Sequence, residues 1–204
     1  KESEKEKFRI QTVKEIRTIA IKKFVFQTES CRYESYNYES LNEEMVQTEY
    51  HIVKKMGEHP NFIQMYGILQ LNSIETIKGN FHNGKKYRYV ILMEYFPGKI
   101  LSKLTPVIFK GEKIEDVVSS KCVIIYQLLI ALEFMARKGV IHRDLKPDNI
   151  LVNGHNLRTK VIDFGLSTQV LGSTNACGTP YYMSPKLVTN EAYNERIDRW
   201  SLGV

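Results

Sequence analysis

The stretch VIHRDLKPDNILV, residues 140–152, decides the fold expected for this chain. Its polar side chains, gathered within eight residues, are His142, Arg143, Asp144, Lys146, Asp148 and Asn149. β-Branched and leucine residues flank this group on both sides, as two short buried strands flank a loop. A charged loop between strands is in most proteins a solvated turn, but so many ionisable groups in one short loop favour a chemical site.

A second acid supports this interpretation. Asp163 in VIDFGL follows nineteen residues after Asp144 and again comes directly after an apolar run. One carboxylate can accept a proton from a hydroxyl group, whereas Asn149 and Asp163 offer oxygen ligands of the kind that magnesium takes alongside phosphate oxygens. The pattern therefore predicts a proton acceptor next to a metal site.

Composition limits the class of protein. The 204 residues, 43% of them hydrophobic, can bury a core in one large domain or two small lobes. The formal net charge is +6, but the basic residues are scattered and not interleaved with aromatics, so we expect no nucleic-acid partner. Three cysteines without metal-ligand spacing favour a reducing compartment. We see no signal peptide and no apolar run of membrane-spanning length, and expect a cytoplasmic protein, with a nuclear location left open.

The expected elements change character near residue 95. Strands are expected over residues 7–13, 18–26, 62–71 and 87–96, a tyrosine-rich loop over 31–40, a helix over 41–56, and a turn at Asn83–Gly84. Gly57 and Pro60 are expected to end that helix. Beyond residue 96 the pattern is largely helical.

A long helix is expected over residues 119–140. Leu128, Ala131, Leu132 and Met135 recur at the spacing of one helical face, and Gly139 is expected to close the helix. The fold class is therefore α+β, with a small β-rich lobe over residues 1–95, a larger helical lobe over 96–204, and a cleft between them.

Four motifs carry a resemblance to a known family. They are HRDLKPDN at 142–149, DFG at 163–165, GTPYYMSP at 178–185 and DRWSLG at 198–203. In this order and spacing they resemble the eukaryotic protein kinases, and Lys146 with Thr179 resembles their serine/threonine type. The resemblance implies a two-lobed fold that binds ATP and Mg²⁺ in its cleft and acts on a Ser or Thr of a protein substrate. It leaves the subfamily, the substrate, the pathway and the oligomeric state open.

The resemblance also implies roles for the polar loop. Asp144 accepts or orients the proton of the substrate hydroxyl, and Lys146 offsets charge on the transferred phosphoryl group. Asn149 and Asp163 hold magnesium. Phe164, like His142, is expected to be a packing residue that joins the lobes.

The nucleotide lysine is expected in the strand TIAIKKF. Side chains alternate along a strand, so Ala20 and Lys22 share one face while Lys23 points to the other, into solvent. The family pattern VAIK, here IAIK, selects Lys22 for the α and β phosphates. Ala20, on the same face, leaves room for a flat adenine ring.

A partner for Lys22 is expected on the helix over 41–56. Met45, Ile52, Val53 and Met56 fall in one arc at 100° per residue, with Glu49 near its centre. Because an unpaired buried carboxylate is costly, we expect Glu49 to pair with Lys22, as in kinases. A hydrogen bond of Glu49 within the lobe is the alternative.

Adenine is expected at the junction of the lobes. VILMEYFPG, residues 90–98, resembles the strand and hinge that bind adenine through backbone groups. The resemblance makes Met93 the residue that guards the deeper pocket, Glu94 to Phe96 the hinge, and Leu151 a floor residue beneath the ring.

The segment from Asp163 to Pro185 is expected to carry a switch. Arg143, beside the expected proton acceptor, is the kind of residue that pairs with a phosphate on this segment. Ser173 or Thr174 is the expected site of that phosphate, whereas Thr179 is expected to hydrogen-bond near Asp144.

Three features depart from the family pattern. No GxGxxG precedes the strand of Lys22, Lys186 stands where the family has a glutamate, and the chain stops soon after Trp200. We therefore expect a partial catalytic domain, truncated at both ends and poorly active by itself. A pseudokinase, which would act as a binding or scaffold module, is the competing interpretation. The intact set Lys22, Asp144, Asn149 and Asp163 argues against it.

Overall fold

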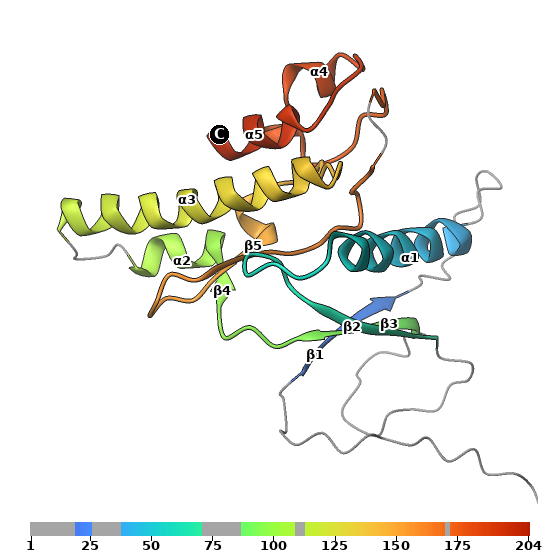
Figure 1. Ribbon diagram of the computed structural model, residues 1–204, viewed down its shortest axis with the longest axis horizontal. Coiled ribbons are helices and arrows are strands. Elements are labelled where there is room, and N and C mark those ends of the chain that lie inside the picture. Colours follow the sequence, from blue (N-terminus) through green and yellow to red (C-terminus); the bar gives the residue numbers. More distant parts are fainter. Residues whose placement is uncertain (1–18, 26–37, 71–86, 109–112, 170–171) are drawn as a thin grey trace, which may run out of the picture.

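The computed structural model describes residues 19–25, 38–70, 87–108, 113–169 and 172–204 (Figure 1). The strand expected over 7–13, the Asn83–Gly84 turn and the start of the expected loop over 31–40 lie outside these residues.

The first sheet is antiparallel and three-stranded, in the order β1-β3-β2 (Figure 1). Its strands are β1 (Ile19–Val25), β2 (Met65–Gln70) and β3 (Tyr87–Glu94). All three expected strands are confirmed with shorter bounds. β2 starts late because Phe62 instead bridges Val161 of another sheet. In the register, Ala20 lies opposite Met93 and Lys22 opposite Ile91.

Helix α1 (Tyr38–Met56) packs against this sheet. It begins three residues before the expected start, inside the expected loop, because no Gly or Pro there stops the helix. Gly57, at φ +82°, ends it as expected. Of the expected apolar arc, Ile52, Val53 and Met56 are buried, but Met45 is 41% exposed and the expectation for it is wrong. Val46 takes the buried position instead.

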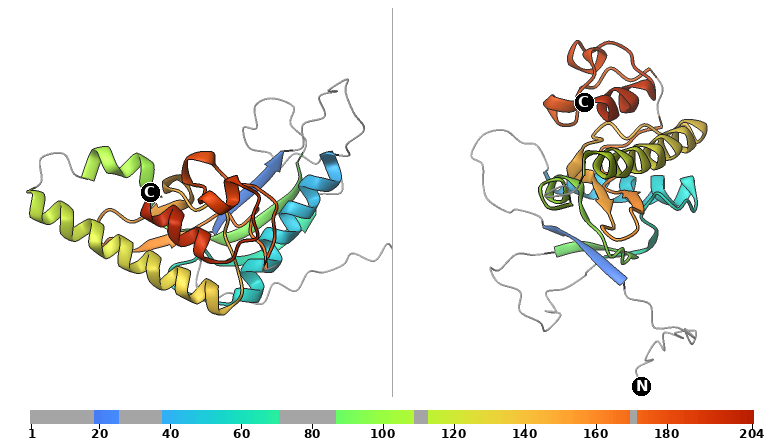
Figure 2. Two further views of the ribbon diagram at one scale, coloured as in Figure 1. Left: turned by 90° about the horizontal axis from the view of Figure 1, so that it is seen from above. Right: turned by 90° about the vertical axis from the view of Figure 1, so that its left-hand side faces the viewer.

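The rest of the chain is mainly helical, as expected. Its elements are β4 (Lys99–Ile100), α2 (Leu101–Ile108), α3 (Ile114–Arg137), η1 (Pro147–Asn149), β5 (Ile150–Val152), β6 (Thr159–Val161), η2 (Pro180–Tyr182), α4 (Pro185–Val188) and α5 (Arg196–Gly203). Strands β4, β5 and β6 form a second small sheet in that order. In Figures 1 and 2, α4 and α5 lie on the side of α3 away from the first sheet.

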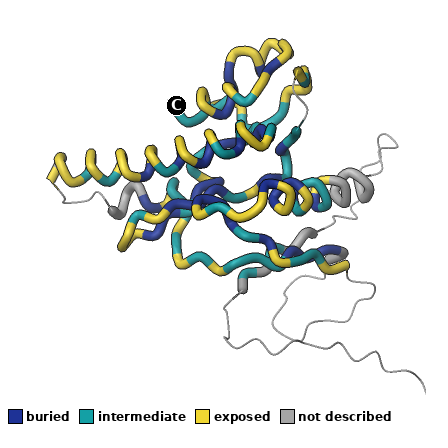
Figure 3. The backbone as a smooth tube through the Cα atoms, viewed as in Figure 1, coloured by how far each residue is buried: buried dark blue, intermediate teal, exposed yellow. Residues whose placement is uncertain are grey.

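Helix α3 starts five residues earlier than expected, at Ile114, where Glu115 and Asp116 suit the positive end of the helix dipole. By length and composition its residues Glu115–Arg137 could cross a membrane, so the expectation that no such stretch exists is wrong. The expected face, Leu128, Ala131, Leu132 and Met135, is nevertheless buried in the protein core. Helix α3 is therefore a helix of the domain and not a membrane span, although much of its other face is exposed (Figure 3).

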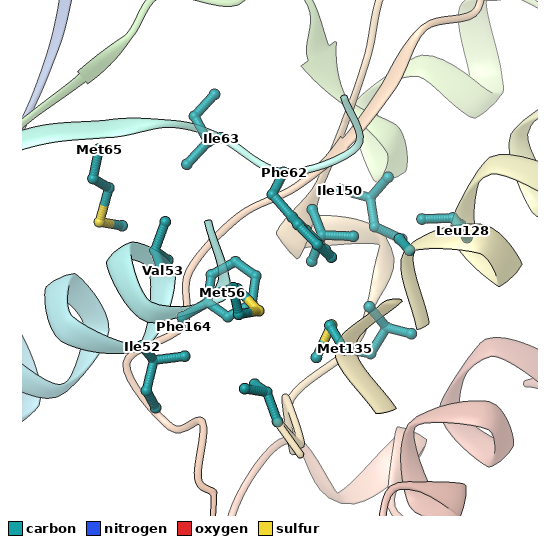
Figure 4. Close-up of a cluster of buried hydrophobic side chains, with 14 of the residues drawn as sticks. Ile52, Val53, Met56, Phe62, Ile63, Met65, Leu128, Met135, Ile150 and Phe164 are labelled. Atoms are coloured by element: carbon teal, nitrogen blue, oxygen red, sulfur yellow. The ribbon is translucent and has the colours of Figure 1, made fainter. Parts of the chain in front are cut away.

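Among the described residues, the larger of two hydrophobic clusters joins the two sheets to helices α1, α2 and α3. It runs from Met56 of α1 through Phe62 and Phe164 to Met135 of α3 (Figure 4). All four side chains are at most 2% exposed. Burying a side chain of this size stabilises a fold by about 1.5–3 kcal/mol, so the core fixes the two halves against each other.

Candidate active site

The loop that carries Asp144 is anchored by a carboxylate from α5. Asp198, only 2% exposed, accepts hydrogen bonds from the backbone N–H of His142 at 2.7 Å and of Arg143 at 2.9 Å. Burial raises the pKa of Asp198, and the two N–H donors act in the opposite direction. Arg143 is held at φ +68°, a conformation that non-glycine residues adopt rarely and only when their surroundings fix it.

Sequence reasoning missed this anchor. DRWSLG was recognised as a motif, but Asp198 was given no partner. The only available signal was the position of Asp198 next to Ile197, which is buried. A buried carboxylate needs hydrogen-bond donors, but the sequence does not show which backbone N–H groups supply them.

Asp144, Lys146 and Thr179 form a hydrogen-bonded triangle. Lys146 Nζ is 2.9 Å from Asp144 Oδ2 and donates to Thr179 Oγ1 at 2.6 Å, while Thr179 Oγ1 donates to Asp144 Oδ1 at 2.7 Å. Partial burial acts to raise the pKa of Asp144, but Lys146 and Thr179 outweigh it and hold that pKa below its usual value. The expected contact between Thr179 and Asp144 is confirmed.

Asn149 completes this group. Its Nδ2 donates to the backbone oxygen of Asp144 at 2.8 Å and to Oδ2 of the same residue at 3.1 Å. The amide nitrogen therefore faces Asp144, and the amide Oδ1 of the buried Asn149 points the other way. An amide oxygen is a group that can bind a cation.

A second charged group connects strand β1 and helix α1 with Asp163. Lys22 Nζ is 2.8 Å from both carboxylate oxygens of Glu49 and 2.9 Å from Asp163 Oδ1. Burial acts to lower the pKa of Lys22, but the two carboxylates outweigh it and raise that pKa. Burial raises the pKa of Glu49, which is 1% exposed, and Lys22 partly offsets this effect. The expected pair of Lys22 with Glu49 is confirmed.

The side chain after Asp163 determines where that carboxylate points. Phe164 is fully buried, edge-on to Phe62 at 5.7 Å between ring centroids and 5.0 Å from His142. The expected packing roles of His142 and Phe164 are confirmed. Asp163 itself is at φ +64°, and its side chain is 48% exposed. The buried ring thus holds the strained backbone so that the carboxylate faces Lys22.

The expected adenine-binding residues lie in the first sheet, in the second sheet and in the segment that connects β3 to β4. Met93 lies between Ala20 and Met65 in the register of the first sheet. Glu94 donates its backbone N–H to Gln64 O at 2.9 Å. Further residues of this region are Phe96 and Leu151, both half-buried, and Leu151 pairs with Ile100 in the second sheet.

Glycine is required where the chain turns after Phe96. A Cβ on Gly98 would overlap the Phe96 ring and lie 2.9 Å from Val152 O.

A cavity of about 240 Å³ lies between α2, α3 and α5. Of the expected site residues only Lys146 lines it, so it adjoins the Asp144 group and does not include the Lys22 group.

Comparison with known proteins agrees with this geometry. The profile of the protein kinase domain matches residues 8–204. The chain belongs to the protein kinase family. It is 39% identical over 150 residues to an Aurora kinase of Eremothecium gossypii, which covers 72% of this chain and 35% of that protein.

Two further kinases show similar identity. Serine/threonine-protein kinase nekl-2 of Caenorhabditis elegans is 34% identical over 79% of this chain and 43% of its own length. The human hormonally up-regulated neu tumor-associated kinase is 34% identical over 74% of this chain and 19% of its own length. The kinase domain described here thus spans less than half the length of these relatives.

The residues of this kinase domain fit the ligands that protein kinases use, ATP and Mg²⁺. Within the described ranges, no group of three or more His, Cys, Asp or Glu side chains could hold a metal ion. Mg²⁺ in kinases needs no such cluster, because one or two protein oxygens, phosphate oxygens and waters complete its shell. Asn149 and Asp163 offer oxygens of this type.

Proposed function

We propose that this kinase domain transfers the γ-phosphoryl group of ATP to a Ser or Thr hydroxyl of a protein substrate. One observation carries the proposal. An ionised Asp144, fixed by Lys146 and Asn149, occurs in the same domain as a Lys22 that is fixed by Glu49 and Asp163. Phosphoryl transfer requires alignment and charge neutralisation rather than a covalent enzyme nucleophile, and these two groups supply both.

The nucleotide end of the site is assigned to the first sheet and to the segment that connects β3 to β4. Lys22 binds the α and β phosphates, and Glu49 keeps its ammonium in place. The backbone of residues 94–96 binds adenine, with Ala20 above the ring, Leu151 below it and Met93 at the back. Asn149 and Asp163 would hold Mg²⁺, which would neutralise charge on the phosphates.

The acceptor end is assigned to the catalytic loop. The lowered pKa keeps Asp144 ionised at neutral pH, so it orients the substrate hydroxyl and accepts its proton as transfer proceeds. Lys146, within 2.9 Å of this carboxylate, lies where it can offset charge on the transferred group. The Lys146–Thr179 hydrogen bond and the names of the relatives support serine/threonine specificity.

A switch on the segment after Asp163 remains part of the proposal. Arg143 Nη1 donates to the Tyr193 hydroxyl at 3.1 Å, and the backbone N–H of Tyr193 donates to Ser173 O at 3.2 Å. This chain of contacts connects the segment to Arg143. A phosphate on Ser173 or Thr174 would compete for the Arg143 guanidinium. Replacing both by Ala should lower activity, and undiminished activity would refute the switch.

The experiment uses the full-length protein with Mg²⁺, ATP labelled at the γ position and a degenerate Ser/Thr peptide library. We expect transfer that requires Mg²⁺ and is abolished in Asp144→Asn and in Asp163→Asn. Transfer that survives Asp163→Asn would refute the metal assignment. ATP binding without any transfer by the wild type would show a non-catalytic binding module instead.

A further inference from the structure

A buried lysine outside the recognised motifs connects the two halves of the domain. Lys160 in β6 is 5% exposed. Its Nζ lies 2.6 Å from Glu94 Oε1 and donates to Phe62 O at 2.8 Å. The same nitrogen lies over the Phe96 ring, 5.8 Å from its centroid.

This arrangement requires a reason, because lysine is almost never fully buried unless it is paired. A strand lysine with no role could occupy a solvent-exposed position, whereas here three groups from two different segments converge on one ammonium. Burying the charge is offset only by a carboxylate, a carbonyl and an aromatic face held in good geometry. Removing one partner leaves the other charge buried and unpaired.

The three partners belong to two parts of the domain. Phe62 is in the loop after α1, and Glu94 and Phe96 are in the segment assigned to adenine. Lys160 itself is three residues before Asp163. Backbone hydrogen bonds fix the strand end of this connection: Val161 N donates to Asn61 O at 2.8 Å, and Ile63 N donates to Val161 O at 3.3 Å. The lysine therefore adds a side-chain link from this rigid strand to the adenine-binding segment.

We propose that Lys160 is a positioning residue for the nucleotide, which fixes the adenine-binding segment relative to Asp163 through its ion pair with Glu94. The inference rests on the proposed function. Adenine is held by the same backbone groups before and during transfer, so the link contributes equally to ground-state and transition-state binding. Its loss raises the dissociation constant and the KM for ATP and leaves kcat nearly unchanged.

The test compares Lys160→Met, Glu94→Gln, the double variant and the wild type in the full-length protein. The dissociation constant for ATP is measured by displacement of a fluorescent ATP analogue, and KM and kcat by initial rates. We expect a rise in both constants of about fivefold or more for Lys160→Met and about threefold for Glu94→Gln, with kcat within about twofold. The double variant should bind no worse than Lys160→Met, because the residues act as a pair.

Lys103→Met is the matched control, since it makes the same change at an exposed lysine of α2 and should alter neither constant. If Lys160→Met does not fold, the nearly isosteric Glu94→Gln still decides. Unchanged ATP binding in Glu94→Gln, or a higher kcat in either variant, would overturn the inference. A wild type that binds ATP without transfer would refute the proposed function while the binding assay still tests Lys160. A wild type that binds no ATP would refute both.

Discussion

Replacing Gly178 by alanine should separate the segment that carries Thr179 from the catalytic loop. Gly178 is at φ +106°, and a Cβ placed there would overlap the backbone oxygen of Arg143. The same Cβ would lie 3.4 Å from Arg143 C and 3.6 Å from Asp144 Oδ1. The backbone of the loop cannot rotate away like a flexible side chain, because Asp198 holds it through two N–H groups.

The magnitude follows from two effects. Alanine in a left-handed conformation costs about 1–2 kcal/mol. Relieving the overlap with Arg143 requires a shift of roughly 1 Å, which breaks the 2.7 Å hydrogen bond from Thr179 to Asp144. A hydrogen bond to a charged group contributes about 1.5–3 kcal/mol. The same misplacement at the reacting centre should lower kcat/KM by about 100-fold.

Gly172→Ala separates these effects. Gly172 is also left-handed, at φ +77°, but a Cβ there would meet nothing within 4 Å. It should lower the free energy of unfolding by about 1–2 kcal/mol and leave kcat/KM within about threefold of wild type. Urea unfolding and steady-state kinetics of the full-length variants measure both quantities. The reasoning is refuted if Gly178→Ala keeps near-normal kcat/KM, or if both variants lose activity equally.

Three further predictions concern the two charged groups and the core between them. Glu49→Ala leaves Lys22 without its buried partner and should lower kcat/KM for ATP about tenfold or more; normal kinetics would show that Lys22 needs no such partner. Thr179→Val removes a donor that lowers the pKa of Asp144. That carboxylate stabilises the fold above its unfolded pKa and loses this effect as pH falls through its folded pKa. Without the Thr179 donor the pKa of Asp144 should rise, so the acid limb of a pH–kcat/KM profile should move to higher pH. An unmoved limb would assign it to another group. Phe164→Ala should lower the free energy of unfolding by about 3–5 kcal/mol in urea, whereas a loss under 1 kcal/mol would contradict its place in the core.

The Lys22–Glu49 pair shows why part of the site was predictable from the sequence. Strand alternation placed Lys22 and Lys23 on opposite faces, and the resemblance to the family pattern selected Lys22. Helical periodicity placed Glu49 on the apolar face of α1. Both periodicities are local, and the requirement that a buried carboxylate be paired converts them into a long-range contact. The structure shows this contact at 2.8 Å. The same reasoning identified the buried face of α3, because a core helix repeats its apolar positions along the sequence.

Residues that act through irregular backbone were not predictable in this way. Asp198 and Lys160 each bind backbone groups of distant segments, and a backbone N–H or C=O has no signature in the sequence. Both residues also contradict the usual rule that charged side chains are exposed. Met45 fails for a different reason: the buried face of α1 passes through Val46, Glu49, Val53 and Met56, so that Met45 lies beside it and is 41% exposed.

The two acids of the proposed mechanism differ in their surroundings rather than in their chemistry. Asp144 has a side chain only 13% exposed and accepts from Lys146, Thr179 and Asn149, so its charge is fixed and its direction is set by three donors. Asp163 is 48% exposed and contacts Lys22 through one oxygen, so it remains accessible to a cation. A carboxylate held by donors on both oxygens suits proton acceptance at a defined angle, whereas a half-exposed one suits metal binding. Exchanging these surroundings would exchange the roles, so the environment, and not the residue type, assigns the chemistry.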